Sequence, residues 1–314
     1  MDFNIRLMQT GDLEVVRRLI PATFSDLFAR ETGVPQHLPI RNYSEMECYL
    51  THQPEGSFVA VGSSGRIVGC VFCHIWGETG WLGPLVVHPS FQGRGIGSRL
   101  LGMATDFLES KCAVVGLETM PQTVANLNLY LRYQYYPEFL RLRMYKTLDA
   151  SDVRISTAYP VPNKIAMDAL LPDISRISRT INPLLDYGQE AESAYMFGLG
   201  ACIFSRSDAE ADGFMIYHQI PDSRRVVVKA MAMDSQGHDS DNRFRQFLRQ
   251  CEAVLEHKGF SDLVVPVYAG HEQAVKVLVA EKYQVIHAGV RMYRRGGGDG
   301  HVVRNRIDLC QWSG

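Results

Sequence analysis

The chain lacks long hydrophobic runs and any large excess of charge of one sign. No stretch approaches the ~18 apolar residues that a membrane-spanning helix needs, and the first twenty residues mix charged and apolar side chains from Asp2 onward. We therefore expect a cytoplasmic protein with no membrane segment and no secretory signal. The formal net charge of −2 gives no general attraction to nucleic acid, so no nucleic-acid partner is expected.

Cysteines are few, and their number of seven is odd, which favours reduced thiols. Cys70, Cys73 and His74 spell the c-type haem attachment motif, but they fall within an expected strand over residues 66–76. Side chains three apart on a strand point to opposite faces, so one haem could not reach both sulfurs. The same geometry makes the pair a poor metal site, and we expect neither haem nor metal.

Familiar nucleotide-binding loops are also missing. The Gly-x-Gly-x-x-Gly dinucleotide pattern begins at Gly93 and Gly95 but fails at Ser98, and no acidic residue ends a strand at the required distance. The phosphate loop of nucleotide hydrolases is excluded because the Gly-Lys-Ser/Thr sequence does not occur.

The stretch Trp81–Ser110 is an apolar strand, a short glycine-rich loop and a helix, and the rest of the chain can be placed around it. Proline has no N–H, so Pro84 and Pro89 prevent continuous pairing along the strand. We therefore expect the backbone N–H groups of Leu85, Val86 and Val87 to face something other than a neighbouring strand. The glycines bring consecutive amides together where the helix begins, and such amides favour an anion. The loop consists of Gln92, Gly93, Arg94, Gly95, Ile96, Gly97 and Ser98.

This Gln-x-x-Gly-x-Gly loop after a kinked strand resembles the GNAT acyltransferase superfamily. In that family the loop amides bind the pyrophosphate of coenzyme A, and the splayed strand binds the pantetheine arm like an added strand. The resemblance implies that Gln92–Ser98 and Leu85–Val87 bind acetyl-CoA. A plain strand-to-helix turn would contain the same glycines, so the elements that follow decide between the two readings.

A strand over residues 114–119 and a helix with Tyr130 continue the resemblance. The family pattern Leu-Tyr-x-x-x-Gly-Phe, preceded by an Asn, implies that Tyr130 protonates the departing thiolate, although an ordinary packed aromatic is the alternative. The chain departs from the pattern at Thr123, in place of Asn, and at Gln134, in place of Gly. Glu118 follows the family's Leu-Glu pattern and is a candidate base acting through water, or a structural carboxylate. His74 is the other candidate base.

The acceptor is left open by the sequence. The favoured interpretation is direct transfer of the acetyl group to the amine of a small molecule. Alternatives are a protein or peptide amine, a longer acyl donor, or a non-catalytic module that binds or senses acyl-CoA; a monomer and a homodimer are both compatible. Residues 21–54 contain carboxylates that would attract a cationic amine or form an ordinary solvated surface: Asp26, Glu31, Glu45 and Glu47.

The elements predict an α/β fold of two tandem GNAT-like domains, each a mixed, mostly antiparallel sheet flanked by helices. A helix from Leu13 is expected to stop at Ile20 because Pro21 interferes, and residues 21–54 are expected to be irregular or short-helical. A three-stranded meander is predicted over residues 58–61, 66–76 and 80–87, and a closing strand over residues 139–148.

An internal repeat predicts the second domain. Gly69–His74 is echoed by Gly213–His218 and Arg143–Lys146 by Arg291–Arg294, and Tyr-Gln recurs at residues 133 and 283, with offsets of 144, 148 and 150. The predicted organisation is an acyltransferase domain (1–148), a linker (149–162), a divergent domain (163–295) and a tail (296–314) that begins flexibly. The divergent domain has one glycine and three carboxylates in residues 234–241 and, on the Tyr-Gln register, Ala280 at the position of Tyr130. We therefore expect coenzyme A in the first domain only.

Overall fold

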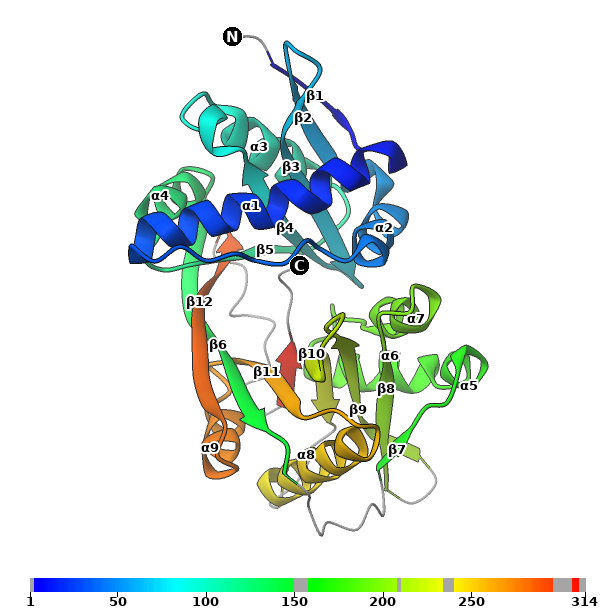
Figure 1. Ribbon diagram of the computed structural model, residues 1–314. Coiled ribbons are helices and arrows are strands. Elements are labelled where there is room, and N and C mark those ends of the chain that lie inside the picture. The colour runs from blue at the N-terminus through cyan, green and yellow to red at the C-terminus, as the bar shows by residue number, and fades with distance from the viewer. Residues whose placement is uncertain (1–2, 150–157, 208–209, 234–239, 296–306, 311–314) are drawn as a thin grey trace. The chain divides into compact units, whose positions relative to one another are not determined.

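The computed structural model describes residues 3–149, 158–207, 210–233, 240–295 and 307–310. They belong to two compact units (Figure 1). Unit 1 is Met1–Tyr136, Met292–Gly297 and Ser313–Gly314, and unit 2 is Pro137–Arg291 and Gly298–Trp312. Within the described ranges, no helix combines the length and apolar character that crossing a membrane requires.

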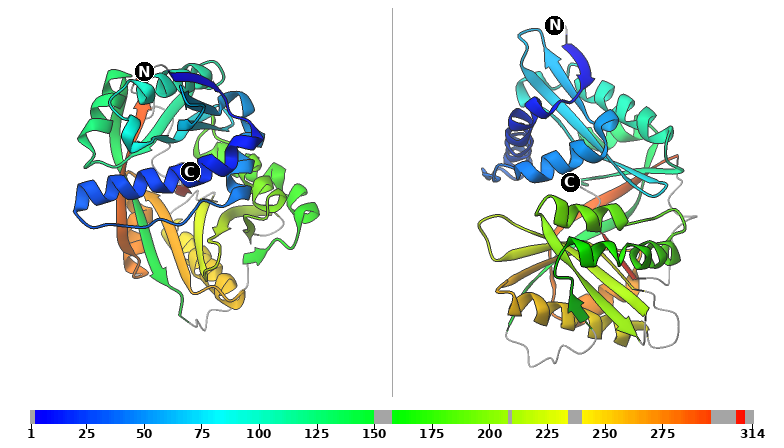
Figure 2. Two further views of the ribbon diagram at one scale, coloured as in Figure 1. Left: turned by 45° about the horizontal axis from the view of Figure 1, so that its top comes forward. Right: turned by 90° about the vertical axis from the view of Figure 1, so that its right-hand side faces the viewer.

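Unit 1 contains a sheet in the order β1-β2-β3-β4-β5, with the end of β12 next to β5. Neighbours are antiparallel from β1 to β4, whereas β4 and β5 are parallel. Helices α1 and α3 pack on β3 and β4 from opposite faces (Figure 2). The elements are β1 (Phe3–Leu7), η1 (Thr10–Asp12), α1 (Leu13–Thr32), α2 (Tyr43–His52), η2 (Pro54–Gly56), β2 (Phe58–Gly62), β3 (Ile67–Trp76), β4 (Thr79–Val87), η3 (Pro89–Phe91), α3 (Ile96–Glu109), β5 (Val114–Thr119) and α4 (Val124–Arg132).

The predicted meander is confirmed by β2, β3 and β4, and the strand after the glycine loop by β5. Apolar residues at helical spacing fix α3 on the sheet, because Ile96, Leu100, Ala104 and Leu108 are all buried. Gly69 in β3 permits this close approach, since a Cβ there would lie 3.1 Å from a Leu100 methyl carbon and 3.4 Å from an Ile96 carbon. The glycine loop is therefore attached to a helix that is packed along its length.

The prediction that α1 stops before Pro21 is wrong, because the helix continues through the proline to Thr32. A proline inside a helix leaves the carbonyl four residues earlier without its usual donor. Here that carbonyl, of Arg17, accepts the N–H of Arg41 at 3.2 Å. Pro21 is itself buried, so packing on the sheet also offsets the lost hydrogen bond.

Unit 2 contains a sheet in the order β6-β11-β10-β9-β8-β7, with β13 also paired to β10. Its described pairs are antiparallel except for β10 and β11, which are parallel. The short helices expected in residues 165–187 are confirmed by α5 and α6. The elements are β6 (Tyr135–Thr147), β7 (Ala158–Pro160), α5 (Lys164–Asp168), α6 (Leu171–Ile181), α7 (Gly188–Met196), β8 (Gly200–Ser207), β9 (Glu210–Gln219), β10 (Arg225–Met233), α8 (Ser240–His257), β11 (Asp262–Tyr268), α9 (Glu272–Ala280), β12 (Gln284–Arg294) and β13 (Ile307–Cys310).

Each unit takes its closing strand from the other half of the sequence. The strand expected to close the first sheet, β6, instead pairs with β11 in unit 2, where Arg141 lies opposite Tyr268. Unit 1 contains the end of β12, and the Tyr293 ring meets the Trp81 ring edge-on at 5.6 Å between centroids. Two halves with the same fold offer similar edges, so their closing strands can be exchanged. The domain boundaries along the sequence stay a prediction.

The repeated hairpins have the same register, as tandem domains of one fold require. Gly69 pairs with Val87 across β3 and β4, and Gly213 pairs with Met233 across β9 and β10. At the other end His74 pairs with Trp81, and its counterpart His218 with Val227, with one irregularity between the two ends of each hairpin. Met231, Ala232 and Met233 therefore correspond to Leu85, Val86 and Val87.

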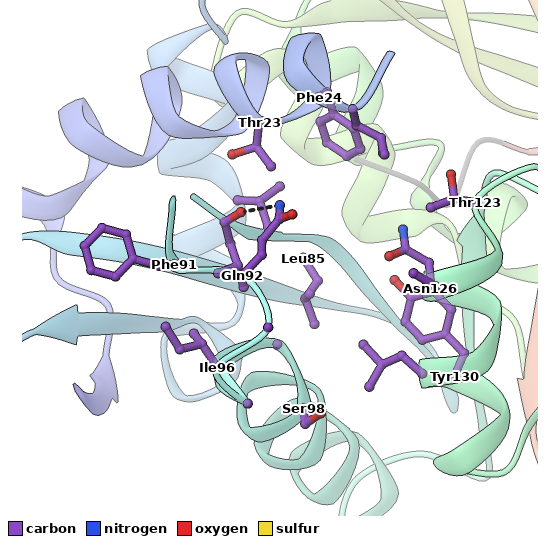
Figure 3. A pocket seen from close by; sticks show the side chains of 18 of the residues that line it. Thr23, Phe24, Leu85, Phe91, Gln92, Ile96, Ser98, Thr123, Asn126 and Tyr130 are labelled. Carbon is purple, nitrogen blue, oxygen red and sulfur yellow. Dashed lines mark hydrogen bonds between the residues drawn. The ribbon is translucent and has the colours of Figure 1, made fainter. Parts of the chain in front are cut away.

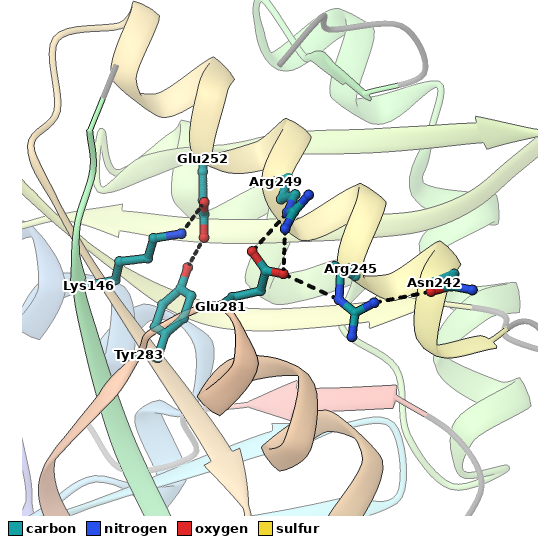
Figure 4. A network of polar contacts seen from close by, with 7 residues as sticks. All are labelled: Lys146, Asn242, Arg245, Arg249, Glu252, Glu281 and Tyr283. Atoms are coloured by element: carbon teal, nitrogen blue, oxygen red, sulfur yellow. Dashed lines mark hydrogen bonds and ion pairs between the residues drawn. The ribbon is translucent and has the colours of Figure 1, made fainter. Parts of the chain in front are cut away.

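A polar network joins α8 to α9 and β6 inside unit 2 (Figure 4). Glu252 accepts hydrogen bonds of 2.6 Å from both Lys146 and Tyr283. Glu281, at the end of α9, accepts a bidentate pair from Arg249 at 2.8 and 2.9 Å. These partly buried charges are paired, as buried charges must be, and they hold the two helices together.

Some expected features lie outside the described residues. They are most of the linker (150–157), the acidic loop up to residue 239 and the start of the tail (296–306).

Candidate functional site

In unit 1 the parallel strands β4 and β5 are hydrogen-bonded over the first part of β4 and then separate. Residues Thr79–Leu82 of β4 pair with Val114–Leu117 of β5. The pairing ends there, although β4 continues to Val87. On its other side β4 stays paired with β3 through Val87. The result is a gap beside Leu85, Val86 and Val87, where the sequence predicted unpaired donors.

Two of these three residues direct their backbone groups into the gap. The N–H of His88 bonds to Val68 on the β3 side at 2.8 Å. N–H groups alternate sides along a strand, so those of Leu85 and Val87 point away from β3 and toward the gap, while that of Val86 points to β3.

The glycine loop presents free amides at the end of the gap. Gly95 has φ of +80° and is the N-cap of α3, and the first helical bond runs from the Arg99 N–H to the Gly95 carbonyl at 3.1 Å. Within the described part of the chain no hydrogen-bond acceptor is recorded for five of the amides. They are those of Gly93, Gly95, Ile96, Gly97 and Ser98. A cluster of free amides at a helix N-terminus is suited to an anion.

The Gln92 side chain bridges two elements around the gap. Its Nε2 donates to the Val87 carbonyl at 2.9 Å, and its Oε1 accepts from Arg30 of α1 at 3.3 Å. Gln92 therefore supports the position of the loop in addition to lining the space beside it.

A cavity of about 450 Å³ occupies this part of unit 1 (Figure 3). It extends from the end of β4 past the glycine loop to α4, with α1 along another side. Of the predicted cofactor residues, the following line it: Leu85, Val86, Val87, Gln92, Gly93, Gly95, Ile96, Gly97 and Ser98.

Tyr130 lies on the α4 side of the cavity and is 7% exposed. Burial raises the pKa of Tyr130 to about 12, and a hydrogen bond with the Thr119 side chain offsets part of this rise. The phenol is therefore protonated at neutral pH and is available as a proton donor. A thiolate, whose conjugate acid has a pKa of ~8.5, is a weaker base than this phenolate, so the proton moves only as the carbon–sulfur bond breaks in the transition state.

The other predicted site residues stand differently. Among the described residues, Arg94 and Glu118 do not line the cavity. Arg94 donates to the Ser90 carbonyl at 2.9 Å, and its guanidinium lies 5.1 Å from the centre of the Phe91 ring. Adjacent strand residues face opposite sides of a sheet, so Glu118 points away from the face where Thr119 meets Tyr130. His74 Nε2 lies 2.7 Å from the Gly83 carbonyl oxygen.

Of the four candidate carboxylates, Glu31 lines the cavity. Asp26 pairs with Arg30 at 2.9 Å. Glu45 is also held within the protein, by Arg41 at 2.9 Å and by the Tyr49 hydroxyl at 2.9 Å. Glu47 does not line the cavity in the described part of the chain. Pairing reduces the ability of Asp26 and Glu45 to attract a cationic amine.

The two cysteines of the haem-like motif are inaccessible to solvent and hold their thiol protons. Cys70 and Cys73 are fully buried in β3, and burial raises the pKa of both thiols. In the described residues no group of three or more His, Cys, Asp and Glu side chains is arranged to hold a metal ion.

Sequence reasoning missed several polar residues of the cavity, among them Thr23, Thr123 and Asn126. Thr23 lies on the part of α1 beyond Pro21, where an irregular or short-helical stretch was expected. Thr123 was noted only as a departure from the family pattern, yet its hydroxyl and that of Thr23 are buried without a hydrogen-bond partner in the described residues. Asn126 stands one helical turn before Tyr130, and this i, i+4 spacing on one helix face was the available signal.

The corresponding helix of unit 2 lacks these groups. His271 is the N-cap of α9 with φ of −86°, as Thr123 is the N-cap of α4 with φ of −86°. Both helices have nine residues, so Tyr130 corresponds to Leu278. The predicted match to Ala280 is wrong, because the Tyr-Gln repeat differs by two residues from the helix register.

Comparisons with known proteins agree with this geometry. A model of the acetyltransferase (GNAT) family matches residues 22–135. The N-alpha-acetyltransferase 30 of Dictyostelium discoideum is 28% identical over 154 residues, covering 47% of this chain and 80% of that protein. Its namesake in Saccharomyces cerevisiae is 30% identical over 119 residues, which span 35% of this chain and 65% of the yeast protein.

Among solved structures, a tandem GNAT protein from the clavulanic acid biosynthesis pathway has a TM-score of 0.61 at 16% identity. The match covers 93% of this chain and 98% of that one, so the likeness of fold extends over both units. Residues 22–135 therefore form a GNAT acetyltransferase domain, which makes the chain an acyltransferase, and the fold of both units is that of a tandem GNAT protein.

Proposed function

We propose that unit 1 binds acetyl-CoA in the gap between β4 and β5 and transfers the acetyl group to an α-amino group of a peptide or protein. The observation that carries the proposal is the open gap itself, which leads from unpaired strand donors to free loop amides and has Tyr130 beside it. The five free amides of the glycine loop bind the pyrophosphate. The donors of Leu85 and Val87 bind the pantetheine arm and the thioester oxygen.

The acyl transfer needs two proton movements. The acceptor nitrogen attacks the thioester carbon, the carbon–sulfur bond breaks, and Tyr130 donates its proton to the sulfur. The proton released by the amine passes to a base, for which Glu118 through water and His74 stay the candidates. Tyr130 regains its proton from solvent, so the reaction is balanced.

Among the described residues that line the cavity, Glu31 is the one acidic or histidine side chain, and an α-amine suits a site with so few bases. The pKa of an α-amino group is ~8, against ~10.4 for lysine, so a large share is already neutral near pH 7.5. The two curated relatives are named as N-alpha-acetyltransferases, which also favours this class of acceptor over the small-molecule amine favoured by the sequence.

Release of free thiol from acetyl-CoA tests the acceptor. We expect peptides with a free α-amine to be acetylated, and the same peptides with a blocked N-terminus and a free lysine to be inert. A panel of small amines and amino sugars is the comparison. Turnover with small amines alone would return the acceptor to the small-molecule class while leaving the acetyl-CoA site intact.

Tyr130→Phe tests the chemistry separately from binding. Loss of the proton donor should lower kcat about 100-fold with little change in the affinity for coenzyme A. Tyr136→Phe is the matched control, because that ring is 48% exposed and does not line the cavity. Unchanged turnover in Tyr130→Phe would remove this residue from the mechanism.

A further inference from the structure

Unit 2 has a gap at the position that corresponds to the cofactor gap of unit 1. Residues Arg225–Val227 of β10 pair in parallel with Asp262–Val264 of β11. Both strands continue well beyond these paired residues. The freed part of β10 includes Met231–Met233, the counterpart in register of Leu85–Val87.

The chain itself fills this second gap. Strand β13 pairs antiparallel with β10, with Ile307 opposite Met233 and Cys310 opposite Ala230. It packs against β11 as well. A peptide strand thus occupies the place that the pantetheine arm takes beside β4 in our proposal for unit 1.

Several buried residues of unit 2 contact β13 and hold it in place. Leu309 is fully buried in the hydrophobic core of unit 2, in one cluster with Met231 and Met233. Arg291, 3% exposed, places Nη2 3.5 Å from the carbonyl oxygen and 3.6 Å from Sγ of Cys310. The Arg291 guanidinium also lies 5.0 Å from the centre of the Tyr268 ring. Apolar burial, backbone pairing and a buried cation therefore all hold this segment.

We propose that the gap between β10 and β11 is a strand-binding site whose ligand is the chain's own segment Ile307–Cys310. The segment satisfies the backbone groups of β10 that would otherwise be buried without partners. It also closes the second gap to coenzyme A, so the chain binds one coenzyme A molecule, in unit 1. This count rests on the proposed function, whereas the strand-binding site does not.

A truncated chain ending at Val303 tests the site with a synthetic peptide of residues 304–314. The truncated chain should melt at a lower temperature than the full chain, and the labelled peptide should bind to it saturably, one per chain, and restore the melting temperature. The peptide with Leu309→Asp should not bind, and the full chain should not bind the native peptide. Wild-type stability of the truncated chain without peptide binding would overturn the proposal, as would uptake of a second coenzyme A in the gap.

Cross-linking of the full-length chain keeps the proposal testable if the truncated chain does not fold. Directly opposed residues on antiparallel strands are close enough for a disulfide. Ala230→Cys should form an oxidation-dependent disulfide with the native Cys310, detected as a linked peptide by mass spectrometry. Ala232→Cys is the matched control, equally buried but opposite Asp308, and should not link to Cys310. Absence of the 230–310 link, or equal linking in the control, would refute the placement of β13 without affecting the acetyltransferase proposal.

Discussion

The two units contain the same hairpin in the same register but differ in what lies beside it. In unit 1 the gap after Leu82 opens into a cavity that ends at free loop amides, and in unit 2 the gap after Val227 is filled by β13. A strand that loses its neighbour has backbone groups that require partners. Unit 1 leaves them for a ligand, whereas unit 2 uses a peptide segment and turns the same place into core.

The helices after these strands differ in the same sense. Three polar residues at α4 and its N-cap line the cavity, namely Thr123, Asn126 and Tyr130, and the corresponding residues at α9 are His271, Ala274 and Leu278. Ala274 and Leu278 belong to the hydrophobic core of unit 2. A duplicated fold can thus keep its sheet while one copy loses the polar groups that a ligand needs.

The largest expected effect is the loss of coenzyme A binding in Gly95→Asp. A carboxylate at this N-cap would lie next to the pyrophosphate, and its repulsion should weaken binding at least about 100-fold. The thermal shift produced by coenzyme A is the measurement. Because unit 2 is expected to bind none, no residual site should remain.

Gly65→Asp is the matched control for backbone strain. Gly65 has φ of +77°, close to the +80° of Gly95, and neither position has atoms within 4 Å of an added Cβ. Gly65 lies in the turn between β2 and β3, away from the cavity lining. An equal loss of coenzyme A binding in both variants would attribute the effect to strain and undo our placement of the pyrophosphate.

The next largest effect is a pH dependence of stability that His271 gives to unit 2 and that its counterpart in unit 1, Thr123, cannot give. Burial, with a smaller contribution from the charge of Arg291, lowers the pKa of His271 to about 4. A histidine with a depressed native pKa takes up protons first in the unfolded state, so stability is full above pH ~6.5 and falls as pH drops toward 4. The shift corresponds to about 3 kcal/mol.

His271→Thr, which copies unit 1, should remove this part of the pH dependence. Denaturant unfolding gives the free energy of unfolding of both proteins at pH 7.5 and pH 5. The loss of stability between the two pH values should be smaller in His271→Thr than in wild type. His257→Thr, at an exposed histidine of α8 in the same unit, is the control. A pH dependence equal in wild type and His271→Thr would contradict a neutral buried His271.

The smallest effect concerns Asn126, whose counterpart in unit 2 is an alanine. Asn126→Ala should raise the KM for acetyl-CoA or the acceptor about 5-fold, the worth of roughly one hydrogen bond, with little change in the melting temperature. Asn128→Ala is the matched control, because this residue of the same helix is exposed and does not line the cavity. Equal effects of the two variants would assign them to helix stability.

Much of the first site was predictable because it is local in sequence. The glycine loop, the kinked strand and the helix with Tyr130 are defined by residues at fixed short spacings, and nine of the ten predicted cofactor residues line one cavity. The contribution of α1 was not predictable, because Pro21 indicated a helix end. What allows the helix to continue is the N–H of Arg41, twenty-four residues away from the carbonyl that accepts it.

The sequence by itself determined the tandem α/β fold, the anion-binding loop and the loss of the phenol in the second half, because each depends on residue types at short range. Only the tertiary structure decided that β6 pairs in unit 2, that the end of β12 belongs to unit 1, and that β13 occupies the second gap. Strand edges have no sequence code of their own. Their backbone groups accept any strand of compatible pattern, so the choice of partner is made by the packing of the whole unit.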